Sequence, residues 1–134
     1  SQYLGPRNIG LDDPFEAARV HGPALLRRLV ERAPWQDRDY GLFYNVNFPP
    51  LPAAEVSGVE VAAQGFREDS HFSVEPHLSP SGRRFLWIRG GPQHRPTAPG
   101  TDVTANLEGR ISVTPMRADL TDHGMLETLR EALA

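Results

Sequence analysis

The sequence contains no cysteine and no lysine among its 134 residues. The first absence excludes a disulfide framework, a thiolate zinc site and a cysteine nucleophile within these residues. The second means that all 14 basic residues are arginine; with 17 acidic residues, the formal net charge is −3. A chain with that charge has no basic field to attract DNA or RNA, so we expect no nucleic-acid partner.

The sequence also has no hydrophobic run near the roughly 20 residues that a membrane-spanning helix needs, and it does not open with a basic segment followed by an apolar one. We therefore expect no membrane partner and a place in the cytoplasm. With 39% hydrophobic and 23% charged residues, the composition is typical of a folded globular chain. The length suits one ordinary domain or a piece of a larger one.

Thirteen prolines and 12 glycines predict short or well-punctuated elements. The clearest is a helix over residues 12–33, in which Asp13 is placed to cap and Pro14 to occupy the first position. Apolar residues recur at helical spacings from Phe15 onward. Pro23 falls inside this stripe and cannot donate a backbone hydrogen bond, so we expect a kink or two abutting helices.

Alternating patterns and turn residues predict the other elements. We expect sheet strands within residues 42–64 (42–48 and 58–64), a hairpin formed by 72–75 and 83–88, a strand at 110–115, a short helix ending at Gly109 and a last helix capped by Asp122. The near-continuous apolar character of residues 42–48 predicts burial on both faces. Such a strand needs more neighbours and helices than the chain supplies, so we expect an α/β fold with further structure before Ser1.

Two groups of residues could bind a metal. Asp12-Asp13 is an adjacent carboxylate pair of the kind that hard cations bind, but capping explains Asp13 fully, and we favour that interpretation. The histidines show no ligand spacing beyond a loose pair, His71 and His77. We favour solvated or locally bonded side chains for all five: His21, His71, His77, His94 and His123.

Three other groups could take part in chemistry or binding. Asp119 and His123, four residues apart, could form a general acid; we favour a junction in which Asp122 caps the last helix and the Asp119–His123 pair fixes its entry angle. Thr101-Asp102 and Ser112 could be a nucleophile and its helper, but no glycine elbow surrounds either.

The predicted hairpin carries Phe72, Phe85 and Trp87 beside several arginines. Such a surface could stack nucleic-acid bases. In an acidic chain without lysine, we favour an oligomer contact for these aromatic side chains.

Several motifs, taken in order, resemble one known family. Residues 43–49 read FYNVNFP, residues 100–102 read GTD, residues 109–116 read GRISVTPM and residues 119–123 read DLTDH. Their order and spacing are similar to those of the SurE family, the stationary-phase survival 5′/3′-nucleotidases, and the resemblance spans nearly the whole chain. Arg110 is a departure, because the family commonly has an aromatic residue there.

The resemblance implies a three-layer α/β/α sandwich, of which this chain is the C-terminal portion, with a protruding β-hairpin and a C-terminal tail helix. It implies hydrolysis of nucleoside monophosphates, and possibly of short polyphosphates, with a divalent metal, magnesium or manganese. The family's metal ligands are an adjacent Asp pair after the first strand, a Ser and an Asn, all in the N-terminal half. None of those motifs occurs here, so we assign no catalytic and no metal-binding residue to this chain.

The resemblance also implies a homodimer or homotetramer. Residues 71–89 would form an oligomer arm, with Phe72, Phe85 and Trp87 at its contacts. Residues 119–134 would form a tail exchanged between subunits, with Asp119, Asp122 and His123 as its hinge. The alternative is a non-catalytic fragment that serves only in oligomerisation.

Overall fold

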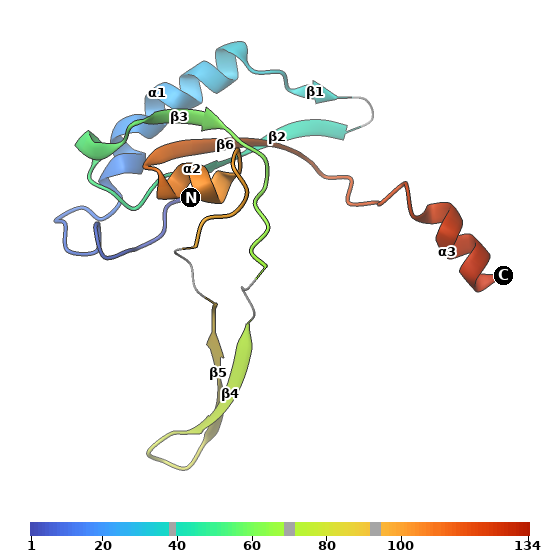
Figure 1. Ribbon diagram of the computed structural model, residues 1–134. Helices are drawn as coiled ribbons and strands as arrows, with labels where there is room; N and C mark the ends of the chain where they lie inside the picture. The colour runs from blue at the N-terminus through green and yellow to red at the C-terminus, as the bar shows by residue number, and fades with distance from the viewer. Residues whose placement is uncertain (38–39, 69–71, 92–94) are drawn as a thin grey trace.

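The computed structural model describes residues 1–37, 40–68, 72–91 and 95–134. Figure 1 shows a body in which a sheet lies between helices α1 and α2, a hairpin that projects from the body, and a C-terminal extension that ends in helix α3. None of the helices in these ranges is both long and apolar enough to cross a membrane.

Helix α1 runs from Glu16 to Arg32 and is one helix of 17 residues that contains Pro23. The prediction of two abutting helices is therefore wrong. Pro23 removes one backbone hydrogen bond, and that loss does not end the helix. The helix begins two residues after Pro14. Asp13 accepts a hydrogen bond from the backbone N–H of Phe15 at 3.0 Å, so it orders the entry to the helix without being its N-cap residue.

The main sheet has four strands in the order β1-β2-β6-β3. Their bounds are Gln36–Asp37 for β1, Tyr40–Asn47 for β2, Gly58–Val61 for β3 and Arg110–Arg117 for β6, with a 3₁₀ turn η1 at Ala53–Glu55. β2 pairs antiparallel with both β1 and β6, whereas β3 pairs parallel with β6. β6 is therefore a central strand, with β2 paired on one side and β3 on the other.

The core lies between α1 and the first half of β6. Ile111 is 1% exposed and packs with Val113, Leu25 of α1 and Phe48, which follows β2. The prediction of two-sided burial for residues 42–48 is wrong, because β2 is half-buried or exposed along its length, with Phe43 46% exposed. The outer neighbour of β2 is the two-residue β1, so the strand buried on both faces is β6.

The projecting hairpin consists of β4, Ser73–Leu78, and β5, Arg84–Arg89. Its turn forms as the sequence predicts: Ser79 Oγ accepts the Arg83 N–H at 3.1 Å, and Gly82 adopts a φ of +79° that favours glycine. Every residue of β5 is exposed. His71, the first residue of the predicted arm, lies outside the described residues.

The remaining helices are short. α2 spans Asp102–Leu107 and is followed by Gly109, whose φ is +80°. α3 spans Leu126–Leu133, which is four residues beyond the predicted cap, and contains no buried residue. The predicted capping role of Asp122 is therefore wrong. Its carboxylate accepts the N–H of Gly124 at 3.1 Å and so stabilises a turn before the helix.

Candidate functional site

One face of the sheet collects the polar side chains of two sequence motifs. The antiparallel register of β2 and β6 places Asn45 opposite Thr114 and Asn47 opposite Ser112. Residues directly opposite one another point to the same face of a sheet, and their neighbours point to the other. We call these four residues the polar face. The intervening Val46 and Val113 contribute to the core beside α1.

Asn106 of α2 fastens that helix to the polar face. Its Nδ2 donates to the backbone oxygens of Asn47 at 3.1 Å and Arg110 at 3.0 Å, and to Ser112 Oγ at 3.3 Å. An amide nitrogen carries two hydrogens, so both donors are engaged with these three acceptors. Sequence reasoning missed Asn106, because a helix of six residues is too short to give a periodic signal.

Asp102 fastens the other end of α2. Its Oδ1 accepts the backbone N–H groups of Gly65 and Val103, each at 2.8 Å, and its own N–H donates to Ala63 O at 2.8 Å. This carboxylate holds the chain beyond β3 against the start of α2. The GTD motif therefore joins two segments that are far apart in the sequence.

The candidate nucleophiles are not available to a substrate. Ser112 is fully buried under Asn106. Thr101 is buried as well, and its hydroxyl donates to Ala98 O at 2.7 Å. Because neither hydroxyl is exposed, the geometry does not support nucleophilic catalysis by either residue.

A pocket of about 510 Å³ opens beside the polar face. The first residues of the chain, the end of β2 and helix α2 form its walls, which include Tyr3, Asn47, Asp102, Asn106 and Leu107. It lies at the carboxyl end of β2, where Gln2 and Phe48 form a parallel bridge. Its walls combine apolar side chains with a few polar groups, which is typical of ligand sites, so this pocket is the candidate binding site.

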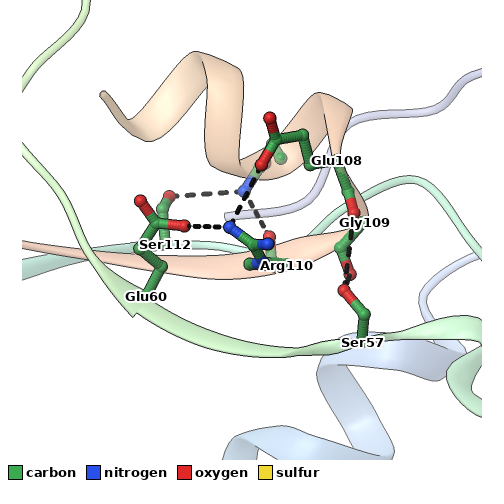
Figure 2. Close-up of polar contacts among 7 residues, drawn as sticks. Ser57, Glu60, Glu108, Gly109, Arg110 and Ser112 are labelled. Carbon is green, nitrogen blue, oxygen red and sulfur yellow. Dashed lines mark hydrogen bonds and ion pairs between the residues drawn. The ribbon is translucent and has the colours of Figure 1, made fainter. Parts of the chain in front are cut away.

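Arg110, which departs from the family pattern, forms ion pairs with two carboxylates. Figure 2 shows its guanidinium between Glu60 and Glu108, with Nη1 at 2.7 Å and 3.1 Å from their carboxylate oxygens. The hydrogen bond to Glu60 is the main cause that raises the pKa of Arg110. Nearby, Ser57 Oγ donates to Gly109 O at 3.2 Å. These contacts join β3, β6 and the end of α2.

The predicted capping role of Asp13 is wrong, because Phe15 is the N-cap residue, but Asp13 still orders the start of helix α1. Asp13 forms an ion pair with Arg19 at 2.6 Å, and that hydrogen bond is the main cause that lowers the pKa of Asp13. Across the described ranges, no group of three or more His, Asp or Glu side chains could hold a metal ion. These residues therefore do not fit the divalent metal that the family resemblance implies.

The histidines are separated in space and locally bonded where they can be described. His21 Nε2 lies 2.9 Å from Ala53 O. His77 lies 3.5 Å from a carboxylate oxygen of Glu75 and stacks on Phe85 with ring centroids 5.7 Å apart. His71 and His94 lie outside the described residues, so for these two the favoured interpretation, solvated or locally bonded side chains, stays a prediction.

The tail contains the predicted Asp–His pair. Asp119 Oδ2 lies 2.8 Å from His123 Nε2, and Asp119 Oδ1 accepts the Thr121 N–H at 3.0 Å. The hydrogen bond from His123, followed by those from Thr121, lowers the pKa of Asp119 to about 2. The pair lies between β6 and α3, in the extension that leaves the body in Figure 1.

We expect His123→Ala to raise the pKa of Asp119 from about 2 toward its ordinary 3.8, because the largest cause of the shift is removed. Since the folded-state pKa lies below the ordinary one, the stabilisation from this pair is present above about pH 4 and is lost as the pH falls toward 2. Carboxyl ¹³C chemical shifts measured against pH follow the titration. His77→Ala is the control, and an unchanged Asp119 pKa in His123→Ala would refute this assignment.

Comparisons with known proteins agree with the resemblance in the sequence. No family model matches the chain. It is 67% identical over 133 residues to the 5′-nucleotidase SurE of Cereibacter sphaeroides strain ATCC 17025, covering 99% of this chain and 51% of that protein. It is 61% identical over 133 residues to the 5′-nucleotidase SurE of Ruegeria pomeroyi, with the same coverage.

The fold is also that of a solved SurE structure. The crystal structure of the SurE protein from Aquifex aeolicus matches with a TM-score of 0.63 and 29% sequence identity, over 100% of this chain and 50% of that one. The predicted SurE resemblance and α/β fold are confirmed. The chain spans about half the length of the curated relatives it matches.

Proposed function

We propose that this chain, whose sequence is SurE-like from end to end, is part of a metal-dependent 5′/3′-nucleotidase of the cytoplasm that hydrolyses nucleoside monophosphates and short polyphosphates. The observation that carries the proposal is the 67% identity, over 99% of the chain, to a protein named a 5′-nucleotidase. Since the described residues do not fit a metal site, we place the metal ligands in an N-terminal half outside these 134 residues.

The proposal is tested by phosphate release from a nucleoside monophosphate in the presence of Mn²⁺. The protein expressed from its complete open reading frame should release phosphate, and EDTA should abolish the release. The 134-residue chain should release none. Inactivity of the complete protein would refute the nucleotidase, whereas EDTA-sensitive activity of the 134-residue chain would refute our placement of the metal ligands.

The exposed apolar side chains of the hairpin favour a second role for this chain, the formation of an oligomer. In the hairpin, Phe72 is 76% exposed, Trp87 is 55% exposed and Phe85 is 42% exposed. An isolated two-stranded hairpin is only marginally stable in water. We propose that the hairpin is the arm of a homodimer or homotetramer, and that residues 119–134 exchange between subunits about a hinge at Asp119, Asp122 and His123.

The arm is tested by the mass of the oligomer in light scattering. Trp87→Ser should lower the mass, because an exposed aromatic anchor is lost from the contact. Phe66→Ser is the matched control, since Phe66 is an exposed aromatic residue outside the hairpin, and it should leave the mass unchanged. Deletion of residues 119–134 should lower the mass as well. A wild-type monomer would contradict the oligomer, and an oligomer without nucleotidase activity would favour the non-catalytic alternative.

A further inference from the structure

The pocket beside the polar face has the size of a small-molecule site. Its volume of about 510 Å³ falls within the roughly 300–1,000 Å³ of ligand pockets. Its walls combine apolar groups such as Val103 and Leu107 with the polar groups of Asp102 and Asn106. A few polar groups among apolar walls are typical of sites that fix the orientation of a ligand.

The polar groups from α2 are acceptors held in fixed positions. Both N–H donors of Asn106 are engaged with the polar face, which leaves its Oδ1 as the group that can bind a ligand. The Asp102 carboxylate accepts hydrogen bonds only, and the N–H groups of Gly65 and Val103 fix its orientation. The complement of such a wall is a ligand rich in O–H and N–H donors, such as a ribose with its base.

The N-terminal loop contributes an aromatic ring to the lining of the pocket. Tyr3 lines the pocket and is 42% exposed. Its backbone oxygen accepts a hydrogen bond from the buried Asn8 at 3.1 Å, which fixes the backbone that carries the ring. An exposed ring on a fixed backbone can stack on a nucleobase, and stacking of this kind tolerates every base.

We infer that this pocket binds the nucleoside of the substrate, with Tyr3 stacking on the base and the acceptors of Asp102 and Asn106 receiving the hydroxyls of the ribose. The inference rests on the proposed nucleotidase and assigns to this chain the recognition of the nucleoside.

The test compares two substrates of the complete protein, adenosine monophosphate and glycerol 2-phosphate, which has neither ribose nor base. Tyr3→Ser removes the stacking ring, and Leu107→Trp fills the pocket from a half-exposed position in α2. Each should raise KM for adenosine monophosphate about tenfold, in line with the loss of one stacked base, and leave KM for glycerol 2-phosphate unchanged. Tyr40→Ser, at an exposed tyrosine of β2, is the control and should change neither.

Equal changes in KM for both substrates would overturn the pocket assignment while leaving the nucleotidase intact. If the wild-type protein hydrolyses neither substrate, the nucleotidase fails. Equilibrium dialysis with adenosine then tests the pocket independently of hydrolysis. The wild type and Tyr40→Ser should bind adenosine, and Tyr3→Ser should bind it about tenfold more weakly. Equal binding by all three, or none by the wild type, would overturn the inference.

Discussion

Ile111→Ala should lower the free energy of unfolding by about 2–5 kcal/mol. Ile111 is 1% exposed and is the second residue of β6, where it packs with Leu25 and Phe48. The truncation removes apolar contacts and leaves a cavity that strands on both sides of β6 prevent from closing. Urea denaturation followed by circular dichroism measures the change.

The matched control is Ile9→Ala, since Ile9 is 63% exposed in the N-terminal loop. That variant should change the free energy of unfolding by less than about 0.5 kcal/mol. If both variants lose equal stability, Ile111 is not at the centre of the core.

Asn106→Ala should lower the free energy of unfolding by about 2–4 kcal/mol, because an unpaired buried polar group costs about 1–3 kcal/mol. The buried Ser112 hydroxyl and the backbone oxygens of Asn47 and Arg110 would all lose their shared donor. Asn106→Asp keeps the shape but replaces the donor by an acceptor, so it should destabilise at least as strongly near neutral pH. The same denaturation measurement applies.

Asn45→Ala is the control for this second variant. Asn45 lies on the polar face and is half-buried, but it is not bound by Asn106. Its truncation should therefore change stability by about 0.5 kcal/mol or less. A loss as large as that of Asn106→Ala would show that the face, and not the donor from α2, supplies the stability.

Elements that depend on a few neighbouring residues could be predicted from the sequence. The turn at residues 79–82 contains its own hydrogen-bonding serine and a glycine with positive φ, so the hairpin could be predicted from a few residues. The single helix across Pro23 could not, because packing of Leu25 against the sheet offsets the lost hydrogen bond.

The strand that is buried on both faces could not be identified from apolar content. Residues 42–48 are more apolar than residues 110–115, yet β6 occupies the centre. A strand's place in a sheet depends on which segments pair beside it, and that information is not local. The predicted capping role of Asp122 is wrong for a related reason, since an Asp can order a turn as readily as it can cap a helix.

The candidate site was only partly accessible to sequence reasoning. The motifs at residues 43–49 and 109–116 led to the SurE resemblance, and the comparisons confirm it. Asn106 joins these two motifs through a contact between α2 and two strands. The spacing of residues in the sequence does not reveal such a contact. The roles of Phe72, Phe85, Trp87 and the Asp119–His123 hinge stay predictions.

The alternation of the two motifs has a consequence for the accuracy of folding. A slip of β2 against β6 by one residue would place Asn45 and Asn47 among the core side chains beside α1, and would turn Val46 toward α2. Amides buried there would lack partners, at about 1–3 kcal/mol each. The two motifs therefore destabilise a misaligned pairing of β2 and β6. Strands that pair in the wrong register should dissociate and pair again before α2 packs on the sheet.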